Sequence, residues 1–235
     1  MKFKRLVKNI FFPERCPICG RIKPFMKYDC ESCGIDTKPI SASACPDCGH
    51  EKCMCSDGAN INLPHFTAVY YYQGQLKKSL LRYKFMSEST LCHTYSEAMA
   101  KRLKELYPNV GFDGICYVPM TKNDERIRGY NQSELLAKGI AKRLDISLVP
   151  CLKKTRVTNA QKNLTAEERQ HNVKDCFRVK EEYSISGKKL ILCDDIKTTG
   201  ATLRECSNAL IKAGAEDVYC ICLAITPYLN YTDPF

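Results

Sequence analysis

The stretch that most constrains the fold is 189–203, KLILCDDIKTTGATL. Its apolar run at 190–193 is short, which predicts a strand buried on both faces. The run stops at two carboxylates, Asp194 and Asp195, and a hydroxyl-rich turn follows. Apolar residues then recur at the spacing of one helix face, namely Leu203, Cys206, Leu210 and Ala213. The sequence therefore predicts a strand, an acidic pair, a turn and a helix, as in an α/β protein with a mainly parallel sheet.

Each part of this stretch has a chemical use. Ligands of open parallel sheets bind past the carboxyl ends of strands, where Asp194 and Asp195 would accept hydrogen bonds from vicinal sugar hydroxyls. The helix start offers unpaired backbone N–H groups and threonine hydroxyls, which favour a phosphate. Gly200 lets the backbone approach closely because it has no Cβ. Two carboxylates that accept hydrogen bonds from a sugar diol, beside a phosphate site, suit a ribose 5-phosphate.

Other interpretations of the stretch are weaker. The spacing matches neither the GxxxxGK[ST] phosphate loop nor the GxGxxG dinucleotide turn. A capped strand-to-helix junction, in which Asp and Thr side chains only satisfy the helix N-terminus, remains the structural alternative.

The run resembles the phosphoribosyl pyrophosphate (PRPP) motif of the type I phosphoribosyltransferases, hydrophobic-DD-x-x-TTG-x-T. The resemblance implies that Asp194 and Asp195 hold the ribose hydroxyls and act in catalysis. It further implies a 5-phosphate wrapped by the turn, whose residues are Lys197, Thr198, Thr199, Gly200, Ala201 and Thr202.

A second candidate region follows the apolar run 114–118, GICYV. We expect a strand there and a loop over 119–129 at its carboxyl end, where Lys122, Arg126 and Arg128 would neutralise a leaving pyrophosphate. The stretch 122–178 holds 13 basic and 7 acidic residues, so much of the formal net charge of +10 comes from it. That excess predicts an anionic ligand, either a polyphosphate or nucleic acid, with a solvated basic surface as the alternative.

Half of the 16 cysteines fall between residues 16 and 55. Three CxxC pairs, each followed by glycine, resemble zinc knuckles, in which thiolates converge on a tetrahedral ion. A disulfide scaffold would need an oxidising compartment, and a redox CxxC would lie at a strand-to-helix junction. We expect one zinc on the first four cysteines and a second on the last four, with interleaved pairing open and His50 as a substitute ligand. The two sets are Cys16, Cys19, Cys30 and Cys33, and Cys45, Cys48, Cys53 and Cys55.

Two further blocks resemble the ComF family, competence-associated phosphoribosyltransferase-like proteins with an N-terminal zinc module. One is Arg126-x-Arg128-Gly-Tyr-Asn131-Gln132, and the other runs from 154 to 177 in the pattern T-x-x-Q-x-x-L-x-x-x-x-R-x-x-N. Lys154 stands where that family often has arginine, and Lys197 where it often has a small or apolar residue. The resemblance also implies a hood over the reacting centre at 159–172.

Taken together, we expect a zinc-binding domain at 1–60 and a phosphoribosyltransferase-like domain at 61–235, without membrane insertion and in the cytoplasm. The resemblance implies Mg²⁺ with PRPP, and single-stranded DNA or competence proteins as partners. Three functions stay open: transfer of phosphoribose to an unknown acceptor, PRPP-responsive DNA handling, and a zinc-dependent scaffold.

Overall fold

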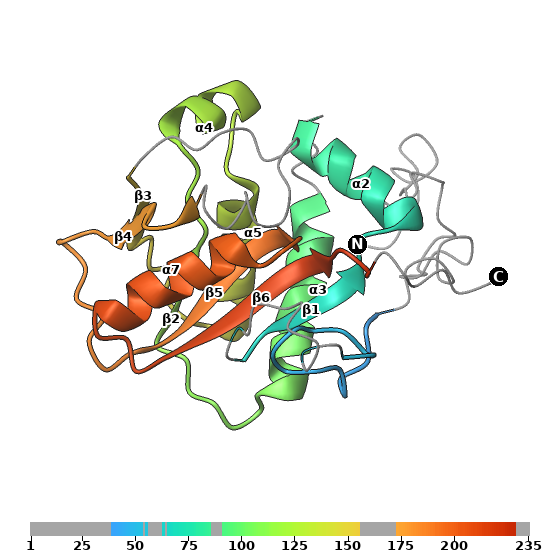
Figure 1. Cartoon of the computed structure of the whole chain (residues 1–235), viewed down its shortest axis with the longest axis horizontal. Coiled ribbons are helices and arrows are strands. Elements are labelled where there is room, and N and C mark those ends of the chain that lie inside the picture. Colours follow the sequence, from blue (N-terminus) through green and yellow to red (C-terminus); the bar gives the residue numbers. More distant parts are fainter. Residues whose placement is uncertain are drawn as a thin grey trace, which may run out of the picture.

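The computed structural model describes residues 39–53, 55, 63, 65–85, 91–155 and 173–228. The elements over this part, in chain order, are β1 Thr67–Tyr71, α2 Gly74–Phe85, α3 Leu91–Leu106, β2 Gly114–Tyr117, α4 Lys122–Arg128, α5 Gln132–Leu144, β3 Leu152–Lys154, β4 Phe177–Val179, β5 Lys189–Lys197, α7 Ala201–Lys212 and β6 Asp217–Ile225. Figure 1 shows them in a layered arrangement of helices and sheet.

The centre of the molecule is a four-stranded sheet in the order β1-β6-β5-β2, with every neighbouring pair parallel. β3 and β4 form a separate antiparallel pair. The carboxyl ends of all four central strands therefore lie at one edge, which is where open parallel sheets bind ligands. The α/β fold expected from the sequence is confirmed.

Alternating side chains of the sheet enter two hydrophobic clusters. Leu190 and Leu192 of β5 pack on the face covered by α7, whereas Ile191 and Cys193 pack on the face covered by α3 and α5. Figure 1 shows α7 in front of the sheet and α3 behind it. Burial on both faces explains the continuous apolar run in the sequence.

β5 is longer than the apolar run predicts. It continues through Asp194 and Asp195 to Lys197, because β6 still pairs with it at Ile196↔Ala224 and Lys197↔Ile225. The acidic pair thus belongs to the strand itself, near its carboxyl end. The turn begins only at Thr198.

The segment predicted as a loop at 119–129 contains the short helix α4. Thr121 begins it, since its hydroxyl accepts a hydrogen bond from the Asp124 amide at 3.1 Å, and Gly129 ends it with φ of 82°. Positive φ is accessible to glycine at little cost. The helix has no buried residue, and Ile127 is 73% exposed.

The described part of the cysteine-rich region packs on the sheet. Ile40 donates its amide to Val69 O at 2.8 Å, and Phe66 donates its amide to Pro46 O at 2.7 Å. Ile40 is buried within the same cluster as β5 and α7. The expected division at 60/61 stays a prediction, but residues 39–50 share the core of the following domain.

Within the part of the chain that is described, no helix combines the length and apolar character needed to cross a bilayer.

Candidate functional site

A cleft of about 640 Å³ lies at the carboxyl edge of the sheet. Its walls come from β5, the turn after it and the start of α7, with further residues from α2, the segment after β2, α4, the start of α5, β3 and β4. The polar and charged side chains lining it are Tyr72, Lys84, Asp124, Arg128, Gln132, Ser133, Lys154, Asp194, Asp195, Lys197, Thr198, Thr199 and Thr202. Gly200 and Ala201 complete the turn.

The two acids have different partners. Lys84 Nζ lies 2.6 Å from Asp195 Oδ2, and the Ser133 hydroxyl donates to Asp194 Oδ1 at 2.7 Å. The backbone amide of Asp195 also donates to Asp194 Oδ1 at 2.8 Å. Neither carboxylate caps α7. The structural alternative, in which Asp and Thr side chains only satisfy the helix N-terminus, therefore applies at most to Thr199, whose hydroxyl accepts from the Ala201 amide at 3.4 Å.

Burial and the charge of Asp195 raise the pKa of Asp194 to about 7, against the lowering effect of the Ser133 hydrogen bond. Burial alone would lower the pKa of Lys84, but the charge of Asp195 and its hydrogen bond raise it. Lys84 therefore carries a positive charge. Asp194, with a pKa of about 7, is partly protonated near neutral pH.

The turn after β5 has the geometry of an anion site. Gly200 adopts φ of 82° immediately before α7, and Ala201 is the first residue of that twelve-residue helix. The first-turn amides of a helix lack intrahelical partners and carry the positive end of its dipole, and residues 198–203 line the cleft.

Lys197 is placed differently from its sequence interpretation. It borders the cleft, but its Nζ donates to Cys48 O at 3.1 Å. Of the three basic residues expected to hold pyrophosphate, Arg128 lines the cleft, whereas Lys122 and Arg126 are exposed on α4 and are not part of the wall. Their assigned roles remain predictions.

The sequence did not single out Lys84 and Ser133. The position of both residues is fixed by contacts of the segment 128–133. Tyr130 Oη donates to Tyr83 O, and Gln132 Nε2 donates to Lys84 O at 3.4 Å. Asn131 caps α5, its Oδ1 accepting from the Ser133 amide at 3.0 Å, while its Nδ2 donates to Val118 O at 3.1 Å. The Gly-Tyr-Asn-Gln signature thus fixes the end of α2 beside the start of α5. Only its match to a family pattern pointed to this region.

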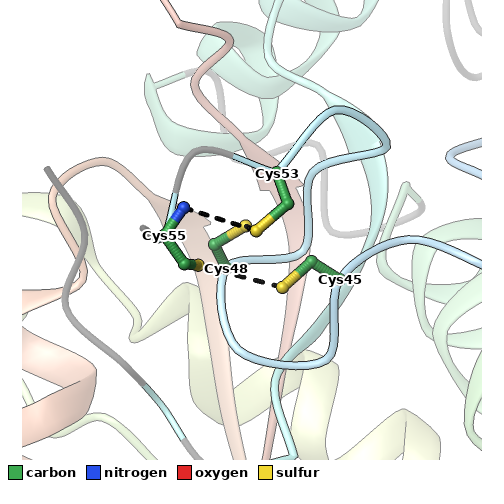
Figure 2. A group of neighbouring side chains, drawn as sticks. All are labelled: Cys45, Cys48, Cys53 and Cys55. Carbon is green, nitrogen blue, oxygen red and sulfur yellow. Dashed lines mark hydrogen bonds between the residues drawn. The ribbon is translucent and has the colours of Figure 1, made fainter. Parts of the chain in front are cut away.

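A second group of polar side chains lies at the cysteine-rich end. The thiols of Cys45, Cys48, Cys53 and Cys55 have sulfur atoms all within 4.8 Å of one another, and Figure 2 shows these side chains converging. Cys45 Sγ lies 3.8 Å from Cys55 Sγ, and Cys48 Sγ lies 3.9 Å from Cys53 Sγ. A tetrahedral zinc with Zn–S bonds of about 2.3 Å requires sulfur separations of about 3.8 Å.

The four thiols therefore fit a structural zinc ion. The His50 ring is not part of the group; it stacks on Tyr228 with ring centroids 3.9 Å apart. The other predicted ligands, Cys16, Cys19, Cys30 and Cys33, lie outside the described residues, as does the expected hood at 159–172.

Two family models match separate regions of the chain. The model of the phosphoribosyl transferase domain matches residues 131–228, and that of the double zinc ribbon domain matches residues 7–61. The first match contains the acidic pair and the turn, and the second contains all eight predicted zinc ligands.

Relatives extend over most of the chain. Competence protein ComFC of Bacillus subtilis is 27% identical over 204 residues, covering 82% of this chain and 81% of the relative. DNA utilization protein YhgH of Escherichia coli K12 is 28% identical over 213 residues, covering 88% and 89%. Competence protein F of Haemophilus influenzae is 28% identical over 225 residues, covering 88% and 95%.

Among solved structures, adenine phosphoribosyltransferase from Thermoanaerobacter pseudethanolicus gives a TM-score of 0.39 at 16% identity, over 60% of this chain and 83% of that one. The phosphoribosyl transferase match contains β5, α7 and β6, and the double zinc ribbon match contains the cysteine cluster. The chain is therefore similar over most of its length to competence proteins of the ComF type, and its match to the phosphoribosyl transferase domain is preceded by a match to the double zinc ribbon domain.

Proposed function

We propose that this protein binds PRPP in the cleft at the carboxyl edge of the sheet and transfers its phosphoribosyl group to an acceptor. One observation supports this most: two acids near the carboxyl end of β5 border the same cleft as the glycine-containing turn before α7. The acids suit the ribose diol, and the turn suits the 5-phosphate.

Cations near the acids suit the other end of PRPP. Arg128 and Lys154 line the cleft with Lys84, and the charge of Arg128 acts on Lys84. A guanidinium binds phosphate oxygens in a bidentate manner, while an ammonium acts as a compact point charge. We assign Arg128 to the pyrophosphate and treat Lys122 and Arg126 as residues that contact it only if α4 moves.

In the transfer, a nucleophilic atom of the acceptor forms a bond to ribose C1 while the bond from C1 to the pyrophosphate oxygen breaks. The electron pair of that bond leaves with pyrophosphate. The ring becomes cationic and the leaving group anionic in the transition state, so preorganised charge supplies the catalysis and no nucleophilic side chain is needed. Mg²⁺, which binds through phosphates and retains waters, would add charge neutralisation at the leaving group.

We place this activity in the cytoplasm, because a thiolate-rich zinc ribbon requires a reducing compartment. The names of the relatives associate such proteins with competence and DNA utilization, and we extend that association to this chain.

Calorimetry with PRPP and Mg²⁺ tests the proposal. We expect Asp194→Asn and Asp195→Asn to weaken binding at least tenfold, because each loses an acceptor for the sugar hydroxyls. Asp145→Asn is the matched control, since Asp145 is exposed at the end of α5 and asparagine also tolerates its positive φ of 56°. Equal affinities for all four proteins would remove the ribose assignment.

A second candidate is a PRPP-responsive protein that handles single-stranded DNA without turnover. The exposed surface of α4, with Lys122, Arg126 and Ile127, favours this reading. Pyrophosphate release against a panel of nucleobases and nucleotides separates the two, since a sensor releases none. Binding of a labelled single strand should weaken as salt increases and should fall further in Arg126→Ala. A salt-independent response would exclude direct DNA binding.

A further inference from the structure

The last residue of β5 carries a buried cation that reaches the cysteine cluster. Lys197 is 3% exposed. Its Nζ donates to Cys48 O at 3.1 Å and lies 5.0 Å from the centroid of the Phe66 ring. Phe66 itself is held to the same loop through its amide bond to Pro46 O at 2.7 Å. The ammonium site is thus built by the loop that carries Cys45 and Cys48.

Such a site needs a compensating charge. Removing an ammonium from water is unfavourable unless it is paired, and one carbonyl with an aromatic ring compensates only in part. Burial lowers the pKa of Lys197, and the thiols of Cys222, Cys48, Cys55 and Cys45 act in the opposite direction and favour its cation. A divalent ion does not neutralise four thiolates, so a loaded Cys₄ centre retains net negative charge beside this cation.

The main chain of Lys197 belongs to the other site. It pairs with Ile225 in the parallel ladder, and the amide of Thr226 donates to Lys197 O at 2.9 Å. Lys197 is the last residue of β5, and the cleft-lining turn 198–202 starts at the next residue. One residue therefore has its backbone at the start of the turn and its side chain on the metal loop.

We propose that Lys197 is a positioning residue that links the metal centre formed by Cys45, Cys48, Cys53 and Cys55 to the turn 198–202, so that zinc binding and PRPP binding support each other. The metal-loaded loop holds the ammonium, and the ammonium fixes where the turn leaves the sheet. Coupling of this kind is reciprocal, because each ligand changes the affinity for the other by the same factor. The part that concerns PRPP rests on the proposed function.

The test compares Lys197→Met, which retains the length of the side chain without its charge, with Lys197→Arg and with the control Lys212→Met. Lys212 is exposed at the far end of α7. Three quantities are measured on the full chain: zinc affinity by competition with a chelator, amide hydrogen exchange of the peptide 198–203, and PRPP–Mg²⁺ affinity by calorimetry.

We expect Lys197→Met to lose at least tenfold in zinc affinity and in PRPP affinity, and to exchange at 198–203 at least tenfold faster. Lys197→Arg should retain most of each quantity, and Lys212→Met should match the wild type. Removing zinc from the wild type should produce the same faster exchange. If Lys197→Met changes only zinc affinity, or nothing, the link is wrong.

A variant on the metal side covers the case in which Lys197→Met does not fold. Cys53 is the exposed ligand, so Cys53→Ser weakens the centre with little effect on packing, and we expect faster exchange at 198–203 and weaker PRPP binding. Unchanged exchange in Cys53→Ser overturns the inference. Absence of PRPP binding in the zinc-loaded wild type instead defeats the proposed function, and the exchange measurements then still decide whether Lys197 links the two sites.

Discussion

Lys84 Nζ lies 2.6 Å from Asp195 Oδ2, across the cleft from the end of α2 to the end of β5. The pair is largely buried, with the two side chains 19% and 12% exposed. A cation from outside the motif therefore pairs with one carboxylate of the acidic pair and fixes its orientation.

Replacing Lys84 by methionine should leave Asp195 without its cation. Since an unpaired buried charge is costly, we expect a loss of about 1–3 kcal/mol in the free energy of unfolding, together with at least tenfold weaker PRPP binding. Urea unfolding and calorimetry measure the two effects. Lys78→Met, on the exposed face of the same helix, is the control, and identical unfolding of the two variants would contradict the role of the ion pair.

Stability should depend on the protonation of Asp194. Its pKa is raised from 3.8 to about 7, first by burial and then by the charge of Asp195. The native state keeps this proton over a range in which the unfolded chain has released it, so the contribution of Asp194 to the free energy of unfolding falls as pH rises from about 4 to about 7 and is constant above that range. Urea unfolding at several pH values should show this slope in the wild type, and a smaller slope in Asp194→Asn.

Ser133 should set the pH at which Asp194 titrates. Its hydroxyl donates a hydrogen bond that lowers the pKa of Asp194. In Ser133→Ala, the pH range over which the free energy of unfolding falls should therefore extend to a higher pH, with its midpoint moved in the same direction. If an ionised Asp194 binds the ribose, PRPP affinity of Ser133→Ala near neutral pH should also fall. The phosphates of PRPP titrate near this range as well, so the profile of Asp194→Asn is subtracted; an unshifted midpoint in Ser133→Ala would argue against the assignment.

Zinc content should follow the Cys45–Cys55 cluster. We expect at least one zinc per chain, and one equivalent fewer in Cys53→Ser than in the wild type, because three remaining thiols close the tetrahedral site poorly. The control is Cys92→Ser, whose thiol lies on α3 and donates to Leu135 O at 3.0 Å. Metal analysis after dialysis gives both values, and fewer than one zinc in the wild type would defeat the cysteine interpretation.

The contact between α3 and α5 should not tolerate a methyl group at Gly139. A Cβ there would lie 2.3 Å from Ser96 Oγ and 2.6 Å from Ser96 Cβ. We expect Gly139→Ala to cost about 1–3 kcal/mol of unfolding free energy, since overpacking outweighs the gain in helix propensity. Gly111→Ala meets nothing within 4 Å and should be nearly neutral in thermal unfolding; equal melting temperatures would show that the helices can separate.

The fold was accessible from the sequence because its strongest signals are local. The apolar run 190–193, the acidic pair and the helix spacing from Leu203 all lie within one strand-turn-helix unit, and the structure confirms that unit and the parallel sheet. α4 was missed because its short length and charged residues give no apolar periodicity; its start and end depend on Thr121 and Gly129 instead.

The candidate site was only partly accessible, because its remaining members come from distant segments. Lys84 and Ser133 carry no pattern of their own, and only the packing of α2, α5 and β5 brings them to the acids. Lys197, in contrast, lies within the motif, but its side-chain contact could not be predicted from its position there. Its place in the motif predicts a phosphate contact, which stays a prediction, and its ammonium donates to Cys48 O, a partner that the motif does not indicate.

The bonds from Tyr130 and Gln132 to the last turn of α2 join segments separated by 47 and 48 positions in the chain. Both bonds are accepted by main-chain carbonyls, so an α2 exchanged with that of a relative keeps them as long as positions 130 and 132 retain their side-chain donors. Among homologues, positions 130 and 132 should therefore keep their hydrogen-bonding capacity more strictly than the side chains at 83 and 84.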